Sequence, residues 1–428
     1  MNKNIFAVSI VLISICAGCG SSPKDTPYDF SKPQPYARPS STTQEKPASI
    51  NGPVSLPDII KYLVAVNPEL KSLEDKVKAA DGAIAQADLL PNPMLHAGYN
   101  ENQKSVEIGQ TIETGGKKSA RVNTAQQKKE QAGLNYQQRK AELILESKQV
   151  FNGVLLAQAE LTFAREQLDI ETKMLGIVQA AYAGGRLPQP ELLNAEISLA
   201  RANLSLNEKS EALKNELQSL RKLLSADNDT SIECKGNLEP AFCDATPQEL
   251  KANMLNNNPQ IKLGQVSVNI NNAQLAEDLA GRISDIKLGV GYMQQGANND
   301  RMLGLSVELP LPLFNRNQGK IAQTKSDISS SKEQLKSVED TLTATLARVI
   351  NNYQLAKDNV LIYQEKILPN EQKNYDITEE SYKSGRVSYQ KALTARARLI
   401  EITLVNLRLV KLLNDTTAEL EYLSGKAE

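Results

Sequence analysis

The two halves of this chain carry the same series of motifs, offset by about 200 residues. The segment YAGGRLPQPELLNAEISLARANL at 182–204 returns as YKSGRVSYQKALTARARLIEITL at 382–404. Shorter pairs follow the same order: Asn67-Pro68 with Asn258-Pro259, Gly98-Tyr99 with Gly291-Tyr292, and Gly116-Lys117 with Gly319-Lys320. A repeat of this length is a whole structural unit. We therefore predict two similar halves, 55–228 and 246–428, joined by a loop at 229–245, and no single active site.

Composition argues against several classes of protein. Of 428 residues, 4% are aromatic and none is tryptophan, which fits long amphipathic helices better than a compact enzyme. The 49 Lys and Arg balance the 50 Asp and Glu, and no sustained basic stripe is present. We therefore expect no nucleic-acid partner.

The N-terminal residues predict export. Residues 1–18 contain Lys3, an apolar run at 5–15 and small residues before Cys19, the layout of a secretory signal peptide. No run reaches the roughly 18 to 20 apolar residues that a membrane helix requires. Small residues directly before a cysteine resemble the lipobox of bacterial lipoproteins, which makes Cys19 the expected lipidated first residue. Cys16 stands where leucine is usual, and cleavage without lipidation is the alternative.

Residues 19–54 are rich in Ser, Pro, Lys and Gln and predict a lipid-anchored tether with little core of its own. Three scattered aromatic residues, Tyr28, Phe30 and Tyr36, favour an extended arm along the body of the protein over a plain spacer.

Cys234 and Cys243 lie in the stretch between the two halves. Disulfides persist in oxidising compartments beyond the inner membrane, so we predict a bridge that closes this small loop. The alternative, a thiol pair that binds a soft metal, lacks a nearby His or further Cys. No metal site is therefore predicted.

Apolar residues spaced three and four apart predict amphipathic helices in both halves. Helices are expected at 57–89, 116–183 and 188–224, and in the second half at 246–280, 319–384 and 388–423. Pro369 interrupts the helix at 319–384 and is expected to kink it.

Between the first two helices of each half the pattern changes to alternation with period two. Strands are expected at 94–100, 105–112, 286–293 and 302–309. In the last strand Leu303 and Leu305 alternate with Gly304 and Ser306. These strands are close to the roughly 9 to 11 residues of a tilted membrane strand, and their polar faces fit a watery lumen. A soluble hairpin packed on a helix is the alternative.

The helix lengths predict a rod. The helix at 116–183 would be about 100 Å long at about 1.5 Å per residue, and the helices at 57–89 and 188–224, about 50 and 55 Å, match it end to end. Four strands cannot close on themselves, and an open sheet edge cannot lie in lipid. The predicted fold class is mainly α with a small β part: duplicated long helical hairpins forming an α-barrel tunnel, plus four strands per protomer in a twelve-stranded trimeric transmembrane β-barrel.

The chain resembles the TolC-like outer-membrane efflux family, in its lipoprotein branch, from about residue 55 to 423. The resemblance rests on the duplicated layout, on ETGGKKSARVNTA at 113–125, on VELPLPLFNRNQGKIAQ at 307–323, and on the two tip turns. The wording VELPLPLFNRNQGKI is similar to that of the heavy-metal efflux factors of the CzcC and CusC type.

The resemblance implies a homotrimeric outer-membrane conduit of a Gram-negative bacterium, with a periplasmic helical tunnel and no cofactor. It also implies docking onto a periplasmic adaptor protein and an inner-membrane pump of the resistance-nodulation-division type. The residues that match the docking turns are Gly185, Arg186, Leu187, Gly385, Arg386 and Val387. Gly184, Gly185 and Gly385 are also expected simply to form the helix-helix turns.

Two positions near the second tip turn depart from the family pattern. Some relatives carry aspartates six and nine residues after the second tip glycine, where this chain has Lys391 and Thr394. The matching places after Gly185 hold Glu191 and Asn194. We predict that Glu191 pairs with Lys391 as an alternative tip latch; solvated surface charge is the competing interpretation.

No catalytic motif is present in the sequence. The single histidine, His96, lies in a predicted strand, so a histidine-dependent catalytic set or zinc site cannot be assembled. We expect a passive efflux channel that conducts, by resemblance, heavy-metal cations. A channel for drugs or for secreted proteins and peptides, and a lipid-anchored scaffold without a pore, are the alternatives. The six methionines are scattered and do not name a cargo.

Overall fold

The computed structural model describes residues 52–100, 103–226, 232–295 and 300–426. All of them belong to one structural unit, Ser49–Glu428. The predicted signal peptide, Cys19 and the three tether aromatics lie outside the described residues.

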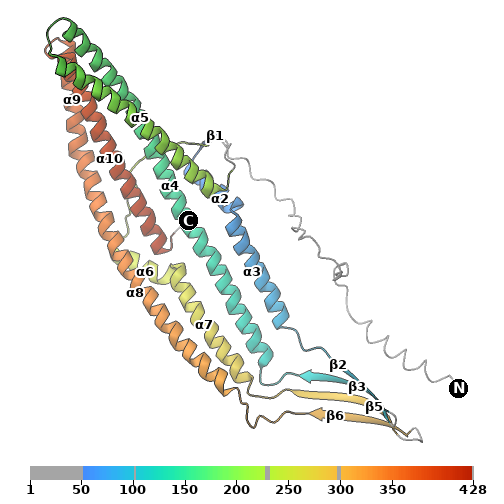
Figure 1. The fold of residues 1–428 in the computed structure, drawn as a ribbon. Helices are drawn as coiled ribbons and strands as arrows, with labels where there is room; N and C mark the ends of the chain where they lie inside the picture. The colour runs from blue at the N-terminus through green and yellow to red at the C-terminus, as the bar shows by residue number, and fades with distance from the viewer. Residues whose placement is uncertain (1–51, 101–102, 227–231, 296–299, 427–428) are drawn as a thin grey trace. The chain divides into compact units, whose positions relative to one another are not determined.

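The predicted duplication is confirmed by the order of elements in the two halves (Figure 1). The first half contains α2 (Leu56–Val66), α3 (Pro68–Ala87), β2 (Met94–Asn100), β3 (Gln103–Ile112), α4 (Lys117–Ala183) and α5 (Gln189–Leu224). The second contains α6 (Pro247–Asn257), α7 (Pro259–Ala280), β5 (Ile286–Gln295), β6 (Asp300–Glu308), α8 (Gln318–Ile362), a π-helical turn η2 (Tyr363–Ile367), α9 (Leu368–Lys383) and α10 (Tyr389–Ser424).

Each predicted first helix is in fact two helices, divided at an Asn-Pro pair. The prediction of one helix at 57–89 and one at 246–280 was wrong because proline disfavours the helical conformation in the residue before it. Asn67 ends α2, and its Oδ1 accepts hydrogen bonds from the backbone N–H groups of Glu69 and Leu70, at 2.9 and 3.1 Å, to cap α3. Asn258 does the same between α6 and α7, with Gln260 N–H at 2.9 Å.

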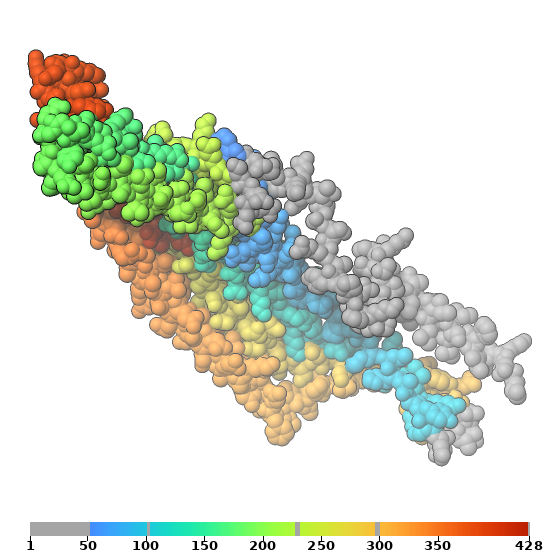
Figure 2. Space-filling view, turned by 45° about the horizontal axis from the view of Figure 1, so that its top comes forward, coloured from blue at the N-terminus to red at the C-terminus, as the bar shows by residue number. Residues whose placement is uncertain are grey.

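Each half builds its own hydrophobic core where the shorter helices pack against the long one. In the first core Ile59, Leu63 and Leu220 are completely buried together with Val154. In the second, Met254 and Ile261 pack with Val349 and Leu413. The helices therefore pair along their length, and the sheet lies at the end opposite the α4–α5 and α9–α10 turns (Figures 1 and 2).

The inter-repeat stretch contains structure that the sequence pattern did not predict. β1 (Gly52–Val54), assigned above to the tether, pairs in parallel with β4 (Ile232–Cys234). Cys234 and Cys243 are both free thiols, so the predicted disulfide is absent from this structure. The physical reason is that they belong to separate environments: Cys234 is buried in the first core, whereas the Cys243 N–H donates to the Tyr353 hydroxyl at 2.9 Å beside the second.

The four remaining strands form one antiparallel sheet in the order β2-β3-β5-β6. β3 of the first half pairs with β5 of the second over ten residues, from Gln103 with Gln295 to Ile112 with Ile286. The two hairpins therefore join side by side, and β2 and β6 are the open edges of the sheet within one chain.

Pro369 interrupts its helix as predicted, but the interruption is a π-helical turn directly before it, at Tyr363–Ile367. Proline has no N–H to donate to the carbonyl four residues earlier, that of Glu365, and its ring crowds that carbonyl. The wider turn at this point relieves the conflict, and the Leu368 N–H donates to the Tyr363 carbonyl.

Within the described ranges, no helix combines the length and the apolar character needed to cross a membrane.

Candidate functional site: the helical tip and the four-stranded sheet

The first tip turn connects α4 to α5 and follows the Schellman pattern. The Gly185 N–H donates to the Tyr182 carbonyl and the Arg186 N–H to the Ala181 carbonyl, each at 2.9 Å. Gly185 has φ +68°, a left-handed conformation that favours glycine. Gly184 also lies in the turn, as predicted, where it caps the end of α4, but its φ of −82° is one that other residues adopt readily.

The second tip turn, between α9 and α10, repeats this geometry. Gly385 has φ +72°, and the N–H groups of Gly385 and Arg386 donate to the Tyr382 and Ser381 carbonyls at 2.9 and 2.8 Å. The Tyr382 and Tyr389 rings then lie 5.1 Å apart across the turn. The two turns occupy the same end of the described unit (Figure 2).

The predicted contact residues share one pattern at both turns. Arg186 and Arg386 are exposed, whereas Leu187 and Val387 are half-buried, two residues before α5 and α10 begin. Neither arginine forms an ion pair with any residue of the described ranges. Each tip therefore presents a free guanidinium beside a turn whose backbone is fixed.

Glu191 and Lys391, the predicted latch, are both exposed and are not paired with each other within this single chain. The Lys391 N–H instead donates to the Ser388 hydroxyl at 3.3 Å, which caps α10. The latch therefore remains a prediction.

Below the tips, a carboxylate joins three helices. The Glu160 side chain on α4 is largely buried and bonds to Lys209 Nζ of α5 at 2.7 Å and to Arg408 Nη2 of α10 at 2.6 Å. Burial opposes ionisation of Glu160, but the hydrogen bonds from Lys209 and Arg408 outweigh it, so the pKa of Glu160 lies below its usual value. This group ties the first half to the second.

The sheet has two different faces. Along β3, β5 and β6 most of the exposed apolar side chains lie on one face, and Met302 is on the other; those on the apolar face include Val106, Ile108, Leu288, Val290, Tyr292, Leu303, Leu305 and Val307. Leu303, Leu305 and Val307 are 83, 85 and 71% exposed in the single chain. This face is not packed as the face of a soluble hairpin would be.

The opposite face carries polar and small residues. Glu107 lies directly opposite Gly291 and accepts a hydrogen bond from the Ser306 hydroxyl. A side chain at Gly289 would meet the ends of the Glu107 and Ser306 side chains, which would have to move to make room for it. His96 is opposite Glu107 on the other side, in β2, as the sequence predicted for a strand residue.

Sequence reasoning found the tip turns because the repeat marks them, but it missed Glu160. Its partners are 49 and 248 residues away, beyond any local pattern. The only signal was a charged residue within the apolar pattern of a long helix. Among the described residues, no group of three or more His, Cys, Asp and Glu side chains is arranged to hold a metal ion.

The duplicated helices, the two-faced sheet and the paired tip turns together define an efflux protein of the outer membrane. The chain belongs to the outer membrane efflux protein family, whose model matches residues 59–226 and 250–424. This assignment also supports the prediction that the chain is not an enzyme.

Three known proteins are similar to this chain. The cobalt-zinc-cadmium resistance protein CzcC of Cupriavidus metallidurans is 23% identical over 360 residues, 83% of this chain and 86% of the relative. The nickel-cobalt-cadmium resistance protein NccC of Alcaligenes xylosoxydans xylosoxydans is 22% identical over 303 residues, 68% of each chain. A crystal structure of CusC shares the fold with a TM-score of 0.69 and 16% identity, covering 95% of this chain and 100% of that one.

Proposed function

We propose that three copies of this chain form an outer-membrane channel that conducts heavy-metal cations out of the cell. The observation that carries the proposal is the sheet, which has one exposed apolar face, one polar face and an open edge on each side. The backbone hydrogen bonds of both edge strands are completed when β6 of one copy pairs with β2 of the next, because closure removes every unpaired edge. Three copies supply twelve strands, with the apolar face toward lipid and the polar face toward water.

The helices continue the channel away from the membrane. Long helices paired along their length in each copy supply the wall of a tunnel when three copies assemble. The tip turns then lie at the far end, where we assign Gly185, Arg186, Leu187, Gly385, Arg386 and Val387 to contact with a periplasmic adaptor and, through it, an inner-membrane pump of the resistance-nodulation-division type. Two free guanidinium groups per copy favour an adaptor surface that offers carboxylates or backbone carbonyls.

The proposed cargo rests on the relatives named for resistance to cobalt, zinc, cadmium and nickel. Metal selection then belongs to the pump, because a wide aqueous conduit needs no chelating cluster of its own. A channel for drugs or for exported proteins or peptides would use the same architecture, and the tests below separate these cargoes.

A deletion strain, with and without complementation, tests the cargo by growth on cobalt, zinc, cadmium, copper and silver salts beside dyes and antibiotics. We expect selective sensitivity to divalent metals that the wild-type gene reverses. Sensitivity to organic compounds alone would contradict the metal assignment and favour the drug channel.

We also propose that Cys19 carries the lipid that anchors the mature chain, with Glu191 and Lys391 forming a latch between neighbouring tips. Metabolic labelling with palmitate should mark the wild type and not a Cys19→Ala variant. Glu191→Ala and Lys391→Ala should raise the single-channel conductance of the purified trimer. Unchanged conductance in both variants would remove the latch.

A further inference from the structure

The two repeats each build a strand-to-helix corner, and the two corners differ in whether their cations are paired with carboxylates. At the first corner, between β3 and α4, every cation has a carboxylate partner. Lys117 pairs with Asp285 at 2.7 Å, Lys118 with Asp88 at 3.0 Å, and Arg121 with Glu113 at 2.7 Å. The first corner is therefore neutralised by the protein itself.

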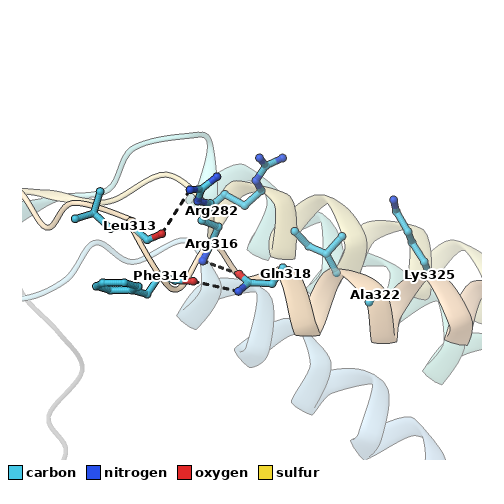
Figure 3. A pocket seen from close by; sticks show the side chains of 8 residues that line it. Arg282, Leu313, Phe314, Arg316, Gln318, Ala322 and Lys325 are labelled. Atoms are coloured by element: carbon cyan, nitrogen blue, oxygen red, sulfur yellow. Dashed lines mark hydrogen bonds between the residues drawn. The ribbon is translucent and has the colours of Figure 1, made fainter.

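At the second corner, between β6 and α8, the cations have no such partners. Arg282, Arg316 and Lys325 line a hollow of about 610 Å³ together with Leu313 and Phe314. None of the three cations forms an ion pair with a residue in the part of the chain that the structure describes. In Figure 3 both guanidinium groups and the Lys325 ammonium point to one side of the α7 and α8 ends.

The hydrogen bonds that fix the backbone of this corner leave the charged groups of the three cations largely unbonded. The Arg316 N–H donates to Gln318 Oε1 at 2.8 Å, and Gln318 Nε2 donates to the Phe314 carbonyl at 3.1 Å (Figure 3). The Arg316 guanidinium makes one long bond of 3.5 Å, to the Leu313 carbonyl. A guanidinium has five donors, so most of this binding capacity remains open.

An apolar strip leads from the sheet to this hollow. It continues the exposed face of β6 through residues that are all exposed, Leu309, Leu311, Leu313 and Phe314, the last of which is 91% exposed. If the sheet lies in the membrane, as proposed above, this strip descends along the lipid to the membrane surface. The three cations then lie at the boundary between the acyl chains and the phosphate headgroups of the membrane.

We propose that the second corner binds the headgroup of an anionic phospholipid. The phosphate contacts Arg282, Arg316 and Lys325, and an acyl chain lies on the strip that ends at Phe314. Charge complementarity favours a lipid of net negative charge, because the choline group of phosphatidylcholine already compensates its own phosphate. The inference rests on the proposed function in one respect only, the membrane position of the sheet.

Two other occupants fit the cations less well. A free phosphate ion would satisfy the charges but would leave Leu313 and Phe314 in water. A carboxylate of a neighbouring copy would make the corner a subunit contact. Both are separated from the lipid in the experiment.

The test uses the purified full-length oligomer in detergent, with native mass spectrometry as phosphatidylglycerol or phosphatidylcholine is added. We expect the wild type to prefer phosphatidylglycerol and the double variant Arg282→Gln/Arg316→Gln to bind it about tenfold more weakly. Lys118→Gln, at the neutralised first corner, is the matched control and should bind as the wild type does. Phe314→Ser should weaken binding of both lipids.

Several outcomes would overturn the proposal. These are equal binding of the two lipids by the wild type, unchanged binding by the double variant, and displacement of the lipid by millimolar inorganic phosphate. Dissociation of the double variant into single chains, where the wild type stays assembled, would make the cations a subunit contact. Circular dichroism checks folding, and Lys325→Gln, expected to give a smaller loss, replaces the double variant should it not fold. Conductance of the wild type in a planar bilayer tests the channel separately from the lipid site.

Discussion

Three glycines lie in the tip turns, but the backbone conformation requires glycine at only some of these positions. Gly185 has φ +68° and Gly184 has φ −82°. We expect Gly185→Ala to lower the free energy of unfolding by about 1 to 2 kcal/mol, because a Cβ in the left-handed region crowds the backbone. Urea unfolding followed by circular dichroism measures the loss. Gly184→Ala is the control and should change little; equal losses would contradict this assignment.

Glu160 predicts a pH dependence. Its pKa is lowered in the folded chain despite burial, because Lys209 and Arg408 bond to the ionised form. The associated stability is therefore present above the unfolded pKa, near 4.5, and is lost as the pH falls through the lower folded value. We expect Glu160→Gln to cost about 2 kcal/mol at neutral pH and to remove this part of the acid sensitivity.

The matched control for Glu160 is Glu211→Gln, which removes an exposed ion pair to Lys214 within one helix. Such a pair contributes on the order of 0.5 kcal/mol. Suppose that both variants lost the same free energy of unfolding and showed the same dependence on pH. The bonds of Glu160 to two other helices would then contribute no more to stability than an exposed pair within one helix.

At the scale of elements, the asparagines at the two Asn-Pro breaks contribute unequally to the stability of the fold. Within the described ranges the Asn67 side chain makes only the pair of bonds that cap α3, whereas the Asn258 side chain caps α7 and also donates from Nδ2 to the buried Leu423 carbonyl at 3.0 Å. Asn258 is 1% exposed. We expect Asn67→Ala to cost about 1 kcal/mol and Asn258→Ala about 2 to 3 kcal/mol, because the latter also strands a buried carbonyl. Thermal unfolding of the two variants compares them; a larger loss for Asn67→Ala would contradict the ranking.

Local periodicity was enough to predict the long helices and the four sheet strands. Helical spacing runs without a break through α4, and Leu303, Leu305 and Val307 alternate cleanly. Periodicity did not predict the breaks at Asn67 and Asn258, because an apolar stripe continues across them and only the Asn-Pro chemistry marks the change.

Features that depend on distant segments were the ones that sequence reasoning missed or misjudged. β1 and β4 are each three residues long and become strands only by pairing across the chain. The cysteines lie close in sequence but enter different packing environments, and burial raises the pKa of the Cys234 thiol to about 12. The pairing of the cations at the two corners also depends on distant segments, since Lys117 finds its partner at Asp285, 168 residues away.

At the scale of the whole molecule, the central question is which face of the sheet meets lipid. Leu305 is on the apolar face near the middle of β6, while Met302 is on the opposite face of the same strand. A charge near the middle of the membrane costs about 2 to 4 kcal/mol on the lipid face of a barrel, and a charge facing the lumen is tolerated. We therefore expect Leu305→Lys to reduce the assembled, membrane-inserted fraction severely, and Met302→Lys to insert normally with altered ion selectivity.

Both variants keep the length of β6 and add the same charge; they differ in the direction of the side chain and, by three residues, in its position along the strand. Membrane fractionation measures insertion, and planar-bilayer recording measures conductance and the reversal potential in a salt gradient. Normal insertion of Leu305→Lys would mean that this face of the sheet does not contact lipid. The sheet would then not be part of a membrane barrel, and the scaffold without a pore would be favoured. Failure of Met302→Lys alone would mean that the two faces are reversed. If only the Leu305→Lys variant fails to insert, the result agrees with a barrel in which the apolar face meets lipid. The polar face, with Glu107 and Ser306, then surrounds the exit path of the cargo.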